Sequence, residues 1–288
     1  MRAVAWKRLP VPRLRRQLRT SARTCVPVDA PADSPYQKDT IVKALLAFGH
    51  NLMPESSGSD VEFTAVPEAN ALLRNDPFAF LIGVICDQGI PAERAWIVPW
   101  ELQRRLGHLD PARMVAEPEA VREAIQAEPK LHRFVNKVPG WLVAAAQKVI
   151  SRWGGDAGRI WASAPEAGEL QRRFEAFRGI GQKKAAMAVA ILSRDLGVTV
   201  NRLDQNDVAY DIHLRRVFLR SHLAEQDDRD HMIGVARALH PEQPSALDLP
   251  TWVIGRTYCA AGAPQCAQCP LTRVCAKDVE GAALAMSS

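Results

Sequence analysis

The chain has 288 residues, of which 47% are hydrophobic and 24% charged, as is typical of a soluble globular protein with one large or two modest domains. No apolar run approaches the roughly eighteen residues of a membrane span, and no signal-peptide pattern follows the N-terminus. The six cysteines, four of them close together, do not resemble a secreted disulfide scaffold. We therefore expect an intracellular, cytoplasmic protein without a membrane anchor.

The net charge of +5 comes from the N-terminal end of the chain. Residues 1–28 hold eight basic side chains and no acidic one, a balance of +8 that leaves −3 for the remaining residues. The stretch 1–38 is rich in Arg, Pro and Ala without periodicity and predicts a basic, disordered arm. The arm is either an extension without a role or an extra nonspecific phosphate contact. Net charge thus gives no argument that the folded body binds nucleic acid.

The hydrophobic pattern predicts helices through most of the remaining chain, separated by Gly, Pro and Asp. The predicted helices cover residues 39–49, 78–88, 92–106 with a kink or break at Pro99, 112–116, 118–127, 141–153 and 185–192, and one more follows Asp211. Strand-like alternation is confined to the short stretch 198–203. The chain is therefore predicted to be predominantly α-helical.

Four cysteines near the C-terminus have the spacing C-x6-C-x2-C-x5-C. They are Cys259, Cys266, Cys269 and Cys275. Thiolates this close together can surround one metal centre, and the single C-x2-C pair favours an iron–sulfur cluster over zinc, whose four-cysteine sites usually have two such pairs. Two disulfides, or neighbours by chance, are the alternative. Cys86 lies in an apolar run and is expected to be a buried core thiol.

A second motif, Phe-Arg-Gly-Ile-Gly-Gln-Lys-Lys-Ala-Ala, occupies residues 177–186. Gly179 and Gly181 flank one aliphatic residue just before a helix start, which predicts a tight hairpin with free backbone N–H groups that can hold a phosphate. About half of such turns simply join two helices. Lys183 and Lys184 follow, and cations at a helix N-terminus oppose the helix dipole. That unfavourable placement favours a functional role.

A third motif begins at Asp211, in the run Tyr-Asp-Ile-His-Leu-Arg-Arg-Val. Asp211 occupies the position of an N-cap, and by itself it is most simply a cap, just as His213 is most simply structural. Farther on, Leu-x-x-Trp-x-x-Gly-Arg-x-x-Cys leads from Leu249 into the four-cysteine segment. The three motifs in this order resemble the endonuclease III branch of the helix-hairpin-helix DNA glycosylases.

This resemblance covers about residues 76–278 and includes the cysteine spacing of the family. It implies an all-α, two-lobed fold with the active site in the cleft between the lobes. A six-helix barrel lobe with the hairpin is expected at residues 76–203. The other lobe, at 39–75 and 204–288, is expected to combine N-terminal helices with a [4Fe-4S] cluster loop. The cluster would hold basic residues on DNA and take no part in the chemistry.

Carried over by position, the resemblance implies Lys183 as the nucleophile and Asp211 as the catalytic aspartate. A carboxylate can stabilise oxocarbenium character at C1′, and a desolvated lysine with a lowered pKa can attack C1′ as a neutral amine. Gln88 matches a glutamine near the gap left by an extruded base. Trp141 lies near the position of an apolar wedge, with core packing as its alternative. The residues expected to contact DNA are Gly179, Gly181, Gln88, Lys184, Arg178 and Trp141.

The chain departs from the family pattern in several places. The hairpin begins Phe-Arg-Gly instead of Leu-Pro-Gly, which adds Arg178 as a possible phosphate contact. Lys184 replaces a common threonine and puts a second amine beside the first. Asp204 and Asp207 are rival carboxylates in a longer connection. Trp96 and Trp100 follow an unusual Gln-Gly-Ile-Pro run and are expected to border the base pocket.

The resemblance implies a monomeric base-excision-repair enzyme of the nucleoid. It would be a DNA glycosylase with AP-lyase activity that removes damaged pyrimidines from duplex DNA through a lysine Schiff base. One alternative is a monofunctional or differently specific glycosylase, acting on uracil or thymine mismatches, hydroxymethyluracil, alkylated purines or mispaired adenine. The other is a noncatalytic iron–sulfur protein that binds DNA.

Overall fold

The computed structural model describes residues 35–52 and 62–286, all of which belong to one compact unit. Most of the predicted arm, residues 1–38, and Cys25 within it lie outside the described residues. No helix in the described ranges is long and apolar enough to cross a membrane.

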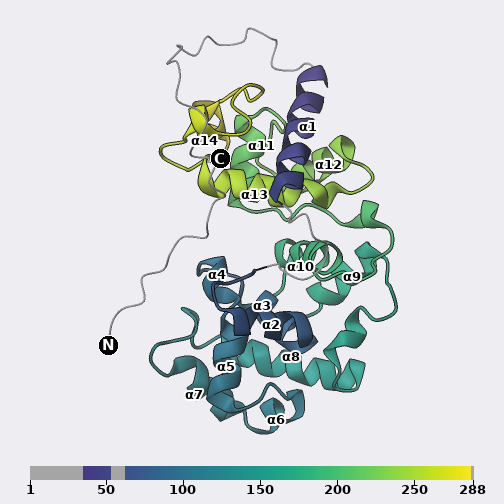
Figure 1. Ribbon diagram of the computed structural model, residues 1–288, viewed down its shortest axis with the longest axis vertical. Coiled ribbons are helices and arrows are strands. Elements are labelled where there is room, and N and C mark those ends of the chain that lie inside the picture. The colour runs from purple at the N-terminus through teal and green to yellow at the C-terminus, as the bar shows by residue number, and fades with distance from the viewer. Residues whose placement is uncertain (1–34, 53–61, 287–288) are drawn as a thin grey trace. The chain divides into compact units, whose positions relative to one another are not determined.

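The described residues are helical and form no strand, which confirms the all-α prediction (Figure 1). The helices are α1 (Pro35–Leu52), α2 (Pro67–Asn75), α3 (Pro77–Cys86), α4 (Ala92–Ala95), α5 (Val98–Leu106), α6 (Pro111–Ala116), α7 (Pro118–Gln126), α8 (Val138–Trp153), α9 (Ala167–Glu175), α10 (Gln182–Arg194), α11 (Ile212–Arg220), α12 (Arg229–Leu239), α13 (Asp248–Thr257) and α14 (Val279–Ala285). Short 3-10 turns lie at Ala157–Ile160, Leu203–Gln205, Pro244–Leu247 and Cys266–Gln268. The strand-like stretch 198–203 makes only one isolated bridge, between Asn201 and Glu166.

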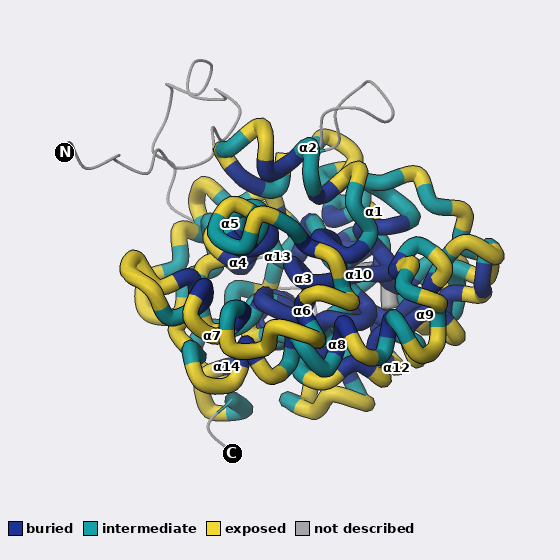
Figure 2. The backbone as a smooth tube through the Cα atoms, turned by 90° about the horizontal axis from the view of Figure 1, so that it is seen from below, coloured by how far each residue is buried: buried dark blue, intermediate teal, exposed yellow. Residues whose placement is uncertain are grey.

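Helix α3 is buried from Phe78 to Cys86 (Figure 2). Asp76 caps it by accepting hydrogen bonds from the backbone N–H groups of Phe78 and Ala79, and Pro77 occupies the first turn, where no N–H partner is needed. Because every side of the helix is covered, its sequence is apolar throughout and shows no 3.6-residue pattern. The predicted helix 92–106 is two helices, α4 and α5, with a break just before Pro99.

Two separate hydrophobic cores define two lobes. The first core runs from Leu73 of α2 to Leu192 of α10 and defines the first lobe. The second core combines Ile41, Val42 and Leu45 of α1 with residues between Val208 and Ala282, and it defines the second lobe (Figure 1). The prediction that residues 39–75 belong to one lobe differs from this packing, because Leu73 of α2 packs in the first core.

Gln182, the first residue of α10, joins the hairpin to the connection that enters the second lobe. Its side-chain Nε2 donates to the carbonyl of Val208 at 2.8 Å, and its Oε1 accepts from the backbone N–H of Tyr210 at 3.3 Å. One amide therefore ties the start of α10 to the segment directly before Asp211.

Candidate active site and cysteine loop

The hairpin between α9 and α10 has the tight form that its glycines predict. Gly179 has φ +89°, and a Cβ at this position would lie 2.9 Å from the ring of Trp141. Gly181 precedes α10, whose first turn has no side-chain cap. The first backbone N–H groups of α10 are therefore open to an anion. Arg178 is exposed beside the turn.

Lys183 projects from this first turn toward the end of α3. Its Nζ lies 3.9 Å from Oδ2 of Asp87, and its side chain is 40% exposed, whereas that of Asp87 is 10% exposed. Burial raises the pKa of the Asp87 carboxyl, while the nearby Lys183 and Lys184 lower it and Asp211 raises it. The structure thus brings Lys183, Asp87 and Asp211 into electrostatic range of one another.

Lys184 is buried and faces away from solvent. Its Nζ donates to the carbonyl of Ile85 in α3 at 2.9 Å. Burial lowers its pKa to about 8, although the neighbouring Cys86 and Asp87 raise it. The sequence-based expectation of a DNA contact at Lys184 has no counterpart in this placement, because the amine is inside the protein. Lys183 is the accessible one of the two amines.

Asp211 is the N-cap of α11, as its position predicts. Its Oδ1 accepts from the backbone N–H groups of His213 at 2.8 Å and Leu214 at 2.9 Å. These two bonds fix the direction in which the carboxylate points. A structural role as a helix cap and a role in chemistry are compatible for Asp211. The cap bonds hold its carboxylate in a fixed orientation where the chain enters the second lobe.

Asp248 stands behind the Asp211 segment, at the start of α13. Its Oδ1 accepts from the backbone N–H of Ala209 at 2.8 Å, and its Oδ2 is buried without a hydrogen-bond partner. Burial raises the pKa of this carboxyl to about 8, partly offset by the Ala209 bond. A protonated Asp248 would satisfy this environment at neutral pH.

The rival carboxylates are both engaged elsewhere. Asp204 pairs with Arg202 on the surface, and Asp207 accepts two hydrogen bonds from Arg237, at 2.7 and 2.9 Å. These ion pairs leave Asp211 as the carboxylate of the connection that faces Lys183 and Asp87.

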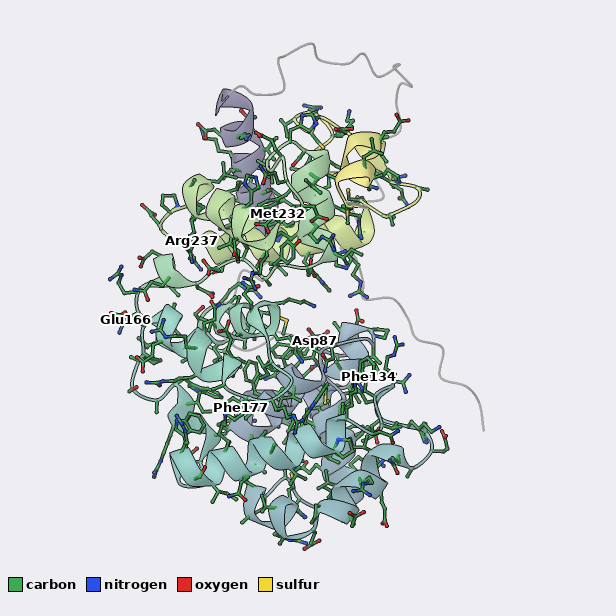
Figure 3. All side chains as sticks on the ribbon, turned by 180° about the vertical axis from the view of Figure 1, so that it is seen from behind. Asp87, Phe134, Glu166, Phe177, Met232 and Arg237 are labelled. Atoms are coloured by element: carbon green, nitrogen blue, oxygen red, sulfur yellow. The ribbon has the colours of Figure 1, made fainter. Side chains whose placement is uncertain are left out.

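Gln88 follows Asp87, and its neighbour Gly89 contacts a loop that is distant in sequence. Its Nε2 is buried without a partner. A Cβ on the next residue, Gly89, would lie 2.8 Å from the ring of Phe134, and Arg133 Nη1 donates to the Gly89 carbonyl at 3.3 Å. Asp87 and Phe134 lie on the same side of the first lobe (Figure 3). The segment 131–134 therefore lies against the Gln88 turn.

The three tryptophans singled out in the sequence lie in different surroundings. Trp141 packs on the hairpin glycine Gly179 and on the first core. Trp96 is buried against Phe63 and Phe80. Trp100 lies under the guanidinium of Arg104. The ring that packs on the hairpin is thus that of Trp141, whereas the ring that packs on Gly89 is that of Phe134.

The four cysteines at the C-terminal end line one pocket in the second lobe. None is in a disulfide. Three of the sulfurs accept hydrogen bonds: Cys259 from Arg220 Nη1, Cys269 from the N–H of Leu271, and Cys275 from the N–H of Lys277. Such N–H···S bonds stabilise thiolate charge at metal centres.

The described residues contain no set of three His, Cys, Asp or Glu side chains arranged to hold a single metal ion. A four-iron cluster binds one thiolate at each iron, so its ligands lie farther apart than those of one ion. Four thiols around one pocket, with N–H donors on three of them, fit a cluster better than zinc. Burial raises the pKa of Cys269 and Cys275 to about 11 in the protein without metal.

Two buried arginines of α11 hold the backbone of this cysteine loop. Arg216 donates to the carbonyls of Gly255 and Cys259, and Arg220 donates to those of Ala260 and Ala261, all between 2.7 and 3.0 Å. The loop is therefore fixed to the helix that begins at Asp211.

Sequence reasoning missed Asp87 and the 131–134 segment. The signal for Asp87 was an ionisable residue at the end of an otherwise wholly apolar helix. The segment 131–134 had no local signal, because its importance comes from the contact with Gly89.

Comparison with solved structures identifies the fold. A trapped endonuclease III–DNA covalent intermediate matches with a TM-score of 0.58 and 18% identity, covering 86% of this chain and 98% of that chain. A thermostable thymine-DNA glycosylase matches with a TM-score of 0.57 and 16% identity, covering 83% and 95%. No family model and no curated protein matches the sequence. The chain has the all-α, two-lobed helix-hairpin-helix DNA glycosylase fold.

Proposed function

We propose that this protein is a base-excision-repair DNA glycosylase with AP-lyase activity, acting on damaged pyrimidines in duplex DNA. The observation that carries the proposal is the accessible Lys183 amine beside Asp87. The Asp211 carboxylate, which caps α11, lies within electrostatic range of Asp87. A binding protein has no need of a lysine and two carboxylates at one point. The likeness to two glycosylase structures supports the proposal.

The chemistry follows from the two main groups. The Asp211 carboxylate stabilises positive charge that develops at C1′ as the bond to the base breaks. The Lys183 amine attacks C1′ and forms a Schiff base, which acidifies the neighbouring sugar proton and permits strand scission by β-elimination. The open N–H groups at the start of α10 and the exposed Arg178 would hold a DNA phosphate.

The extruded base must be replaced in the stack by protein. Gln88, with its unpartnered buried amide, and the adjoining Arg133 and Phe134 form one edge of the proposed site. We assign the wedge role to Phe134 in preference to Trp141, because an aromatic ring beside Gln88 can fill the gap. Trp141 then supports the hairpin from behind.

We propose further that Cys259, Cys266, Cys269 and Cys275 hold a [4Fe-4S] cluster. Bound there, the cluster supplies an anchor for the loop and takes no part in the reaction at C1′. Purified protein is expected to be brown, with a broad absorbance shoulder at the blue end and about four irons per chain. A colourless protein with one zinc per chain would contradict this assignment.

Borohydride trapping tests the central proposal. Wild-type protein is expected to form a covalent adduct with a duplex that contains one damaged pyrimidine or an abasic site, and Lys183→Ala is expected to form none. Lys43→Ala, which removes an exposed lysine of α1, is the matched control and should trap like the wild type. Equal trapping by Lys183→Ala would show that another amine reacts.

The alternatives predict different outcomes on the same duplexes. A monofunctional glycosylase releases a base without a trapped adduct, and a panel of single-lesion duplexes then identifies that base. A noncatalytic DNA-binding protein binds the duplexes tightly and releases no base from any of them.

A further inference from the structure

Asp87 is a buried carboxylate with a single ion-pair partner in the described part of the chain. It is 8% exposed, and its Oδ2 lies 3.9 Å from the Nζ of Lys183. Burial in a protein interior penalises an ionised carboxylate unless a cation compensates it. The other nearby amine, that of Lys184, is committed to the Ile85 carbonyl. Lys183 is therefore the cation that Asp87 faces.

We propose that Asp87 positions Lys183 and accepts its proton as the amine attacks C1′. This inference rests on the proposed function and adds to it a residue that the sequence motifs do not include. It also answers a chemical need, because a lysine amine is protonated at neutral pH and an ammonium group has no lone pair with which to attack.

The step balances without another reactant. A proton passes from the Lys183 ammonium group to an Asp87 carboxylate oxygen, and the freed lone pair forms the N–C1′ bond. The group that leaves C1′ departs with the electron pair of the broken bond and with the proton that Asp87 holds. That group is the base in a damaged duplex and a hydroxyl, leaving as water, at an abasic site.

The surroundings of Asp87 favour this transfer. Burial raises the pKa of its carboxyl, and so does the negative charge of Asp211 and Glu93. A higher pKa at the acceptor brings it closer to the pKa of the amine, so the proton moves at a lower cost. The charged and titratable groups near Asp87 come from three other elements and from its own chain neighbour. They are Lys183 and Lys184 of α10, Asp211 before α11, Glu93 of α4, and Cys86, which directly precedes Asp87.

The geometry leaves room for the step. The 3.9 Å separation exceeds hydrogen-bond distance, and the Lys183 side chain is 40% exposed, so the amine can move between Asp87 and a bound sugar. A lysine locked in a tight ion pair would have no such freedom. Catalytic hydrogen bonds are often long before substrate binds.

The test is the pH dependence of trapping by Asp87→Asn, which keeps the shape of the side chain and removes its charge. With a duplex carrying one abasic site, the single-turnover trapping rate at neutral pH is expected to fall by about 10²–10⁴-fold. The rate should recover as pH rises, because hydroxide in solution can then accept the proton in place of Asp87. Asp87→Glu is expected to keep the wild-type pH slope at a reduced rate.

Two results would overturn the inference. One is a trapping rate of Asp87→Asn equal to that of wild type at every pH. The other is a faster rate at neutral pH, which would show that Asp87 only holds the lysine in its charged form. If Asp87→Asn does not fold, a changed pH slope in Asp87→Glu overturns the inference in its place.

Asp207→Asn is the matched control. Asp207 is also 8% exposed and also pairs with a cation, but that cation is Arg237 of α12 and not Lys183. Its removal should leave the pH slope unchanged. Wild-type protein that traps no abasic duplex would refute the proposed function itself, whereas normal wild-type trapping with an unaltered Asp87→Asn profile would refute only the role of Asp87.

Discussion

The first lobe and the cysteine loop of the second lobe are stabilised in different ways. The first lobe has a continuous apolar core with paired aromatic rings, among them Phe80 with Trp96 and Trp161 with Phe174. In the second lobe the cysteine loop contributes one fully buried apolar side chain, Leu271, and its backbone is held by buried arginines. Packing fixes the first lobe, whereas directed polar bonds fix the cysteine loop of the second.

This difference separates two tasks. The first lobe carries Lys183 and Asp87 on a scaffold that is ordered by a continuous apolar core. The cysteine loop depends on arginine donors and, in our proposal, on a cluster. The feature that most clearly marks the family resemblance thus lies in a different lobe from Lys183 and Asp87.

The strongest challenge to the comparison is a truncation in the first core. Phe174→Ala removes a fully buried ring and should lower the free energy of unfolding by about 3–5 kcal/mol. Chemical denaturation measures this loss. Iron content per folded chain should stay unchanged, and a loss of iron would show that the two lobes are not independent.

A smaller effect is expected from the arginine that holds the cysteine loop. Arg220→Leu removes the donor from the carbonyls of Ala260 and Ala261, at a cost of about 1 kcal/mol for each lost hydrogen bond. The variant should lose iron faster than wild type under a chelator. Arg202→Leu, which removes an exposed arginine paired with Asp204, is the control and should retain iron normally.

A pH-dependent effect is expected from the polar support behind Asp211. The pKa of Asp248 is about 8 in the folded protein, above its ordinary value of 3.8. Its contribution to stability is therefore complete below about pH 4 and is lost as pH rises through about 8. Asp248→Asn keeps the acceptor for Ala209 and escapes this loss. In thermal melts the variant should equal wild type near pH 4 and gain on it by up to about 1.4 kcal/mol for each pH unit from there to pH 8.

Local patterns predicted much of the fold and part of the site. The helix periodicity, the Gly-x-Gly turn and the capping position of Asp211 depend on neighbours in sequence, so they could be read from the chain. The role of Asp87 could not be predicted from the sequence, because it depends on the contact with Lys183. Lys183 lies far along the sequence and comes close to Asp87 only in the folded chain. The break between α4 and α5 lay where Pro99 suggested it.

Contacts between residues far apart in sequence also determine the placement of Lys184 and Trp141. The burial of Lys184 depends on a bond to Ile85, and the packing of Trp141 depends on the closeness of Gly179. Neither residue type reveals by itself whether it faces solvent, a partner or the core. The sequence therefore indicates candidate residues. The fold then shows which of them are accessible and which pack inside the protein.

The amide of Gln182 has a consequence for how a duplex would be engaged. Both of its polar atoms bind the connection, at Val208 and Tyr210, and its chain neighbour is Lys183. Swinging the lobes apart would break both bonds at once and would separate Lys183 from Asp211. In the proposed function, bonds that resist this separation leave more of the bending and unstacking to the DNA, whose stiffness at each sequence would then contribute to the choice of site.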